Sequence, residues 1–92
     1  MTKVDFRNIE IKDINGLMTK ADVTKLFGNM LYMQGQSIEE CELGQAIYHQ
    51  GDKDGPESLE LDDKQCEIVK RFAAMLPYVM RTGLLEAVKP NL

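Results

Sequence analysis

The sequence predicts an α+β fold in which an N-terminal β-hairpin packs on three or four α-helices. Residues 9–17 alternate apolar and polar side chains around an Asn-Gly pair, which is typical of a hairpin with a tight turn. Most of the remaining chain carries apolar residues at helical spacing, interrupted by glycines and prolines. A length of 92 residues and a hydrophobic content of 43% are those of one small globular unit, so we expect a single domain over residues 1–92.

The hairpin is expected to cover about residues 4–23, and the length of its loop decides which face is buried. A two-residue loop would mix apolar and charged side chains on one face, which makes a poor core face. A three-residue loop, with Gly16 in the left-handed position of a bulge, pairs Glu10 with Lys20 and sorts the apolar residues onto one face. We predict this second loop, with a bulge or a strand break at residues 7–8. The expected apolar face consists of Ile9, Ile11, Leu17 and Ala21.

Two helices are expected directly after the hairpin, at about residues 24–34 and 38–50. We expect Asp22 to be the N-cap of the first helix, and Ser37 with Glu40 to form a capping box at the start of the second. Each helix carries a predicted apolar stripe. The stripe of the first is Leu26, Phe27, Met30 and Leu31, and that of the second is Ile38, Cys41, Ala46, Ile47 and Tyr48.

An exposed loop is predicted at residues 51–58, where glycine, proline and charged residues are concentrated. Two further helices follow, at about residues 63–76 and 78–88. Asp62 and Gln65 form a second capping-box pattern, and Pro77 must interrupt the helical region because it lacks a backbone donor. Pro90 is expected to end the last helix. The third helix has the clearest apolar face, which consists of Cys66, Val69, Phe72, Ala73 and Leu76.

Composition and charge disfavour several classes of ligand. The net charge is -4, whereas a protein that neutralises phosphates needs a concentrated positive excess. The helix at residues 38–50 follows a short turn, as in a helix-turn-helix, but it begins with glutamates and contains no lysine or arginine, so nucleic acid is disfavoured. No apolar segment typical of a signal peptide and no run of about 20 apolar residues occurs, so we expect no membrane insertion and a cytoplasmic location.

No set of residues predicts catalysis, cofactor binding or a metal site. Asp52 and Asp54 begin a pattern like a calcium-binding EF-hand loop, but proline and glutamate follow where an oxygen ligand and a glycine belong. His49 lacks a nearby partner, and Cys41, about two helical turns earlier, is too distant to be its nucleophile. Cys41 and Cys66 form no metal-binding pair. We therefore expect a protein that is not an enzyme.

Methionines and tyrosines supply more large apolar side chains than the helix stripes can hide. They could fill an irregular core or cover an oligomer interface, and the sequence leaves both interpretations open. Because closed two-fold dimers are the commonest soluble assembly, we expect self-association as a homodimer or binding of another protein. The candidate interface residues are Tyr32, Met33, Tyr78 and Met80.

Three segments resemble small proteins encoded by tailed phages and prophages: residues 4–11 (VDFRNIEI), 42–51 (ELGQAIYHQG) and 59–61 (LEL). The resemblance covers most of the chain and includes no catalytic signature. It implies a role in virion assembly or in interference with host proteins, in the host cytoplasm or the virion. The expected function is a non-catalytic protein-binding module, such as a phage or prophage assembly or accessory protein. The alternative is a small transcriptional or host-interaction regulator that contacts nucleic acid.

Overall fold

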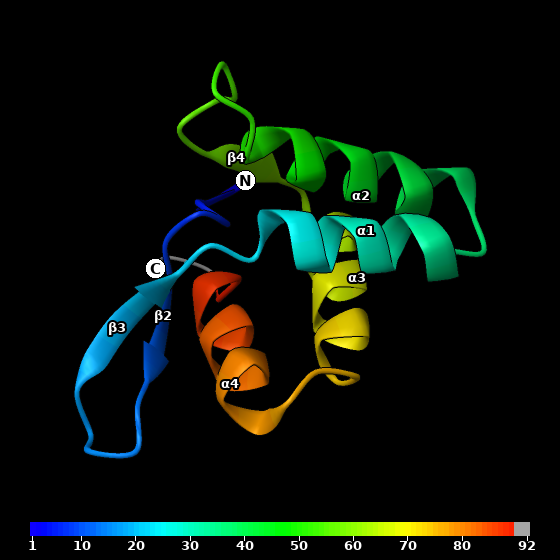
Figure 1. Cartoon of the computed structure of the whole chain (residues 1–92). Coiled ribbons are helices and arrows are strands. Elements are labelled where there is room, and N and C mark those ends of the chain that lie inside the picture. The colour runs from blue at the N-terminus through cyan, green and yellow to red at the C-terminus, as the bar shows by residue number, and fades with distance from the viewer. Residues whose placement is uncertain (90–92) are drawn as a thin grey trace.

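The predicted hairpin and helices all form, and the α+β class is confirmed (Figure 1). The computed structural model describes residues 1–89. In chain order the elements are β1 (Thr2–Val4), β2 (Ile9–Lys12), β3 (Met18–Ala21), α1 (Thr24–Gln34), α2 (Ile38–Gln50), β4 (Leu59–Leu61), α3 (Asp63–Ala73) and α4 (Tyr78–Ala87). The strands form two separate two-stranded sheets, β1 with β4 and β2 with β3. Pro90, the expected end of the last helix, lies outside the described residues.

The hairpin of β2 and β3 has the predicted loop and register. Glu10 lies opposite Lys20, and Gly16 has a φ of +84°, which glycine adopts without a steric penalty. The predicted apolar face is wrong in one residue. Leu17 is 64% exposed, because it follows the turn beyond the last strand pair.

The residues before the hairpin form a separate strand, so the predicted start of the hairpin at residue 4 is wrong. β1 pairs antiparallel with β4, with Val4 opposite Leu59, and the chain turns at residues 6–8 before β2 begins. Of the two alternatives predicted at residues 7–8, a bulge or a strand break, the structure shows the break, and the hairpin spans residues 9–21. The sequence did not reveal the pairing of β1 because its partner strand is distant along the chain.

Helices α1 and α2 have the predicted ends and lie side by side (Figure 1). Their backbones meet closely at two glycines: a Cβ added to Gly28 would lie 2.7 Å from the carbonyl oxygen of Gly44. This contact sets the rotation of both helices, so the predicted stripes are partly wrong. The buried residues are Thr24, Phe27, Gly28 and Leu31 in α1, and Leu43, Gly44, Ile47 and Gln50 in α2. The predicted stripe residues that are instead exposed are Leu26, Ile38, Ala46 and Tyr48.

The caps of α1 and α2 differ in detail from the predicted ones. The N-cap position of α1 falls one residue after Asp22, whose carboxylate accepts hydrogen bonds from the backbone and hydroxyl of Thr24. At α2, Ser37 accepts from the N–H of Glu40 as predicted, but the Glu40 carboxylate accepts from Gln36. Both arrangements still satisfy backbone N–H groups at the start of a helix.

Helix α3 has its predicted cap and buried face but ends early. Asp62 and Gln65 form the complete capping box. The predicted end at residue 76 is wrong, because the helix ends at Ala73 and residues 74–76 turn the chain into Pro77, which precedes α4. A proline disfavours helical backbone in the residue before it. The buried face contains every residue predicted for it: Cys66, Val69, Phe72, Ala73 and Leu76.

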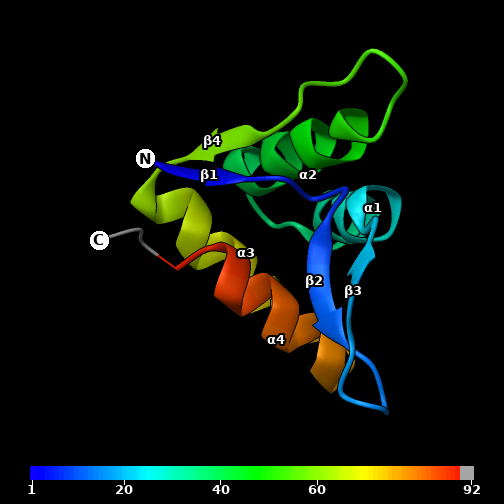
Figure 2. The same ribbon diagram turned by 90° about the vertical axis from the view of Figure 1, so that its left-hand side faces the viewer.

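The core lies between the pair α1–α2, the pair α3–α4 and the hairpin. Phe6, in the link between β1 and β2, stacks on Phe27 of α1 with ring centroids 6.2 Å apart. Both rings are fully buried. Helix α4 packs along β2, and Figure 2 shows that β1, β2 and α4 frame one side of the molecule.

Candidate functional site

The outer edge of β2 carries backbone groups that have no partner. Asp13 donates a backbone hydrogen bond of 2.9 Å to the carbonyl of Leu17, so these two residues form a hydrogen-bonded pair. Such pairs alternate with non-bonded ones along an antiparallel ladder, so the odd-numbered residues of β2 bond to β3 and the backbone groups of Glu10 and Lys12 face away. Among residues 1–89, no hydrogen bond reaches those outward N–H groups. The N–H groups of Glu10 and Lys12 are therefore unpaired at the outer edge of β2.

Helix α4 lies close against this edge because Gly83 has no side chain. A Cβ on Gly83 would lie 2.5 Å from the carbonyl oxygen of Glu10 and 2.9 Å from Cγ2 of Ile9. The approach to the Glu10 carbonyl agrees with the ladder alternation, which points this group away from β3. Any larger residue at position 83 would push α4 away, so glycine sets the distance between helix and strand.

A groove of about 620 Å³ lies between the outer edge of β2, α4 and β1; Figure 2 shows how these three elements are arranged. We call it the hairpin groove. Three exposed apolar side chains line it, Met18 from the hairpin and Tyr78 and Val79 from α4. Lys3 and Lys12 contribute positive charge to the same lining. The groove thus combines free backbone groups on one wall with apolar surface on the other.

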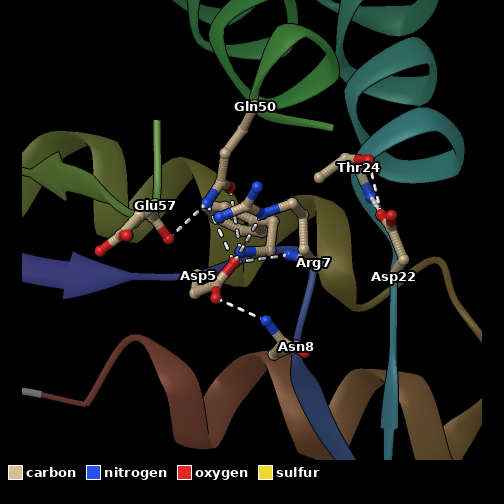
Figure 3. Close-up of polar contacts among 8 residues, drawn as sticks. Asp5, Arg7, Asn8, Asp22, Thr24, Gln50 and Glu57 are labelled. Carbon is tan, nitrogen blue, oxygen red and sulfur yellow. Dashed lines mark hydrogen bonds and ion pairs between the residues drawn. The ribbon is translucent and has the colours of Figure 1, made fainter. Parts of the chain in front are cut away.

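A polar cluster holds the link between β1 and β2 at one end of the hairpin groove (Figure 3). The buried side chain of Gln50, at the end of α2, accepts from the N–H of Phe6 at 3.0 Å and donates to the carboxylate of Asp5 at 3.0 Å. The same amide donates to the carbonyl of Glu57 at 3.1 Å. Burial of an amide requires such partners. The cluster ties β1, α2 and the loop after α2 to the corner of the groove.

Asp5 is the centre of this cluster and lines the groove. Its carboxylate accepts from the side chain of Asn8 at 2.7 Å and from the backbone N–H of Arg7 at 3.0 Å, and Nε of Arg7 lies 3.5 Å away. Partial burial raises the pKa of Asp5, but the hydrogen bonds from Asn8 and Arg7 and the charge of Arg7 outweigh it, so the pKa lies below its usual 3.8. The carboxylate is ionised and already bonded, which suits a structural role.

The four predicted interface residues are divided between surfaces. Tyr78 lines the hairpin groove, whereas Tyr32 lines a smaller hollow of about 200 Å³ between α1 and α2. Met33 is exposed near the end of α1, and Met80 is half-buried against the core. Of these four residues, the structure brings Tyr78 to the hairpin groove.

The residues weighed for chemistry form a surface cluster on α1, α2 and the following loop. Nδ1 of His49 lies 2.8 Å from the Asp52 carboxylate, which also pairs with Lys25, and Lys25 Nζ lies 3.9 Å over the ring of Tyr48. Hydrogen bonds from Lys25 and His49 lower the pKa of Asp52 below its usual value. Within residues 1–89, no group of three or more His, Cys, Asp or Glu side chains could hold a metal ion.

Comparison with protein-family models, curated proteins and solved structures finds no match to this chain. No helix among residues 1–89 is both long enough and apolar enough to cross a membrane.

Sequence reasoning missed the unpaired N–H groups of Glu10 and Lys12 at the edge of β2 and the wall residue Val79. The predicted register contained a signal for the edge, because it already determines which backbone groups of β2 face away from β3. No local sequence pattern indicated that α4 would lie beside that edge.

Proposed function

We propose that the protein is a non-catalytic protein-binding module that binds an extended protein segment in the hairpin groove. The observation that carries this proposal is the hairpin groove, in which the exposed apolar side chains of Met18, Tyr78 and Val79 lie near the unpaired N–H groups of Glu10 and Lys12. A segment that lies in the groove would offer carbonyl oxygens to those N–H groups, while α4 already covers the carbonyl of Glu10.

The α4 wall of the hairpin groove suits the side chains of such a segment. Tyr78 and Val79 are 73% and 45% exposed, and Thr82 lines the groove with them. Alternate side chains of an extended segment point to the same face, so every second residue would pack on this wall. The wall then supplies a preference for apolar side chains.

β3 has an open edge, but it is the weaker candidate for a binding site. The backbone groups of Met18 and Lys20 face away from β2 by the same alternation. β3 packs mainly on β2, so a segment added there would find no helix wall for its side chains.

The proposed biological setting rests on the resemblance of three segments to small phage and prophage proteins. A module that binds protein fits an assembly or accessory role in the host cytoplasm or the virion, and self-association as a homodimer belongs to the proposal. The alternative, a regulator that contacts nucleic acid, has less support. The start of α2 exposes Glu39 and Glu42, and the net charge of the chain is -4.

Selection of random peptides on the protein, followed by amide hydrogen exchange, tests this proposal. Bound peptides should slow exchange at the Glu10 and Lys12 amides and leave the amides of Met18 and Lys20 in β3 unchanged.

A matched pair of variants makes the test specific to the groove. Val79→Asp should weaken peptide binding about tenfold or more, because it places a charge in the apolar wall. Leu26→Asp makes the same kind of change at an exposed position of α1, outside the groove, and should leave binding unchanged. Full binding by Val79→Asp, or protection only of other amides, would contradict the proposal.

A further inference from the structure

Helices α1 and α2 contain two nine-residue segments with matching sequences, residues 27–35 (FGNMLYMQG) and 43–51 (LGQAIYHQG). The segments are identical at four positions, which are two glycines, a tyrosine and a glutamine, and similar at three others. Because a three-residue turn joins the helices, they run antiparallel (Figure 1). Two matching antiparallel segments that meet at the same glycine are related by an approximate two-fold axis.

Contacts at the crossing of the two helices show this relation. A Cβ on Gly28 would lie 2.6 Å from the backbone nitrogen of Tyr48 and 2.7 Å from the carbonyl oxygen of Gly44. The reverse holds from the other helix, where a Cβ on Gly44 would lie 2.7 Å from the backbone nitrogen of Tyr32 and 2.8 Å from the carbonyl oxygen of Gly28. The two tyrosines therefore stand at equivalent positions on either side of the crossing.

The hollow of about 200 Å³ between α1 and α2 lies at this crossing and is lined by both glycines. The side chains of Tyr32 and Tyr48, which are 48% and 38% exposed, line it from the two helices. The amides of Asn29 and Gln45, which are equivalent in the two segments, line it as well, together with His49. Of the described residues, those that line the hollow include no aspartate, glutamate, lysine or arginine. The hollow therefore presents two aromatic rings and several hydrogen-bond donors.

Tyr48 is held in place by contacts outside the hollow. Nζ of Lys25 lies 3.9 Å from the centroid of the Tyr48 ring and donates to the carbonyl of Tyr48 at 3.0 Å. Lys25 is itself paired with Asp52. The ring of His49 packs edge-to-face on that of Tyr48, with centroids 5.5 Å apart. A ring that is fixed before binding loses little conformational entropy on binding, so this wall of the hollow is preorganised.

Three properties of the hollow select its occupant. Its volume is below the about 300 to 1,000 Å³ that is typical of small-molecule sites, so it suits one or two side chains of a protein segment. Its residues lie in helices, whose backbone groups bond along each helix, so a strand cannot be added here. Its amide and hydroxyl groups can donate to carbonyl oxygens. A polyproline II segment matches all three, because it presents proline rings, has carbonyls without internal hydrogen bonds, and docks in aromatic-lined grooves.

We infer that the hollow between α1 and α2 is a second protein-binding site, which takes a proline-rich segment in the polyproline II conformation. Proline rings of the segment pack against Tyr32 and Tyr48, and the amides of Asn29 and Gln45 donate hydrogen bonds to its carbonyl oxygens. The site is separate from the hairpin groove, and the inference does not depend on the function proposed for that groove.

Nuclear magnetic resonance of the nitrogen-15-labelled full chain, titrated with a synthetic polyproline peptide to millimolar concentration, tests the inference. The side-chain NH₂ signals of Asn29 and Gln45 should shift, because these groups bond to the peptide. The backbone signal of Val79, in the hairpin groove, should stay in place. A glycine-serine peptide of the same length is flexible and has no preformed polyproline II helix, so it should not bind.

Substitutions of the three tyrosines make the test specific to the hollow. Tyr32→Leu and Tyr48→Leu should each raise the Kd about tenfold or more, because each removes one of the two rings. Tyr78→Leu removes the third tyrosine of the chain, which is exposed outside the hollow, and should leave the Kd unchanged. Gln45→Ala changes an exposed helix position to the best helix former, so it should stay folded and still weaken binding severalfold.

Thermal melts confirm that each variant is folded before its Kd is compared. Shifts of both side-chain amides, with loss of affinity in Tyr32→Leu and in Tyr48→Leu, support the inference. It is overturned if the polyproline peptide does not bind, if the glycine-serine peptide binds as tightly, or if either of these variants keeps the parent Kd. Equal weakening by Tyr78→Leu overturns it as well. Shifts confined to the hairpin groove overturn this inference and leave the function proposed for that groove standing.

Discussion

Replacing Gly83 by alanine tests how closely α4 must approach β2. In an exposed helix interior, alanine is more favourable than glycine by about 1 kcal/mol. At position 83 the added Cβ would lie 2.5 Å from the carbonyl oxygen of Glu10 and 2.9 Å from Cγ2 of Ile9. Carbon and oxygen atoms in close contact ordinarily stay about 3.3 Å or more apart. The helix must therefore move several tenths of an ångström away from the strand.

Such overpacking costs about 1 to 3 kcal/mol. Because the cost exceeds the gain in helix propensity, Gly83→Ala should lower the free energy of unfolding by about 1 kcal/mol. In a domain of this size, that loss lowers the Tm by about 4 to 8 °C. The shift should also widen the hairpin groove, because the backbone of α4 would no longer touch β2.

Thermal denaturation followed by circular dichroism measures the change, and Thr82 provides the matched control. Thr82 is exposed in the same helix, so Thr82→Ala should be more stable than Thr82→Gly by about 1 kcal/mol. At position 83, by contrast, the alanine variant should be less stable than the parent chain with glycine. If Gly83→Ala instead raises the Tm as the control pair predicts, α4 does not press on β2 and the described wall of the groove is wrong.

Three further predictions concern the turn, the core and the polar cluster. Gly16→Val should lower the free energy of unfolding by about 1 kcal/mol or more, because a φ of +84° is strained for a β-branched residue; an unchanged denaturation midpoint would contradict the turn. Phe72→Ala should cost about 3 to 5 kcal/mol, since Phe72 is 7% exposed in the core; a melt within a degree or two of the parent would exclude that burial. The folded pKa of Asp5 is lowered, so its contribution to stability is present above its unfolded pKa of about 3.8 and is lost as the pH falls through the folded pKa. The difference in unfolding free energy between the parent and Asp5→Asn should therefore shrink below that pH, and a difference independent of pH would refute the role of the Asp5 charge.

Features that depend on a few neighbouring residues were predictable from the sequence. The choice between two hairpin loops followed from the faces of Glu10 and Lys20 and from the left-handed preference of Gly16. The capping box at Asp62 and the interruption at Pro77 likewise rest on backbone groups within one helical turn. The structure confirms all of these.

Features that depend on distant partners were predicted poorly. The stripes of α1 and α2 were misassigned because the contact of Gly28 with Gly44, rather than hydrophobicity alone, sets how the helices face each other. The pairing of β1 with β4 and the burial of Gln50 also depend on partners that are distant in the chain. Gln50 is a polar residue at a helix end, and its burial is favourable only because Asp5 and Phe6 meet it there.

The sequence by itself determined the alternation of β2, and with it both the outward direction of the Glu10 and Lys12 backbone groups and the charges beside them. That outcome is local, because the direction of each strand residue follows from its neighbours and from the loop length. The tertiary structure alone decided that α4 lies against this edge and leaves a groove along it. The position of α4 depends on the close approach allowed by Gly83 and on core contacts between segments far apart in the chain, which no local pattern specifies.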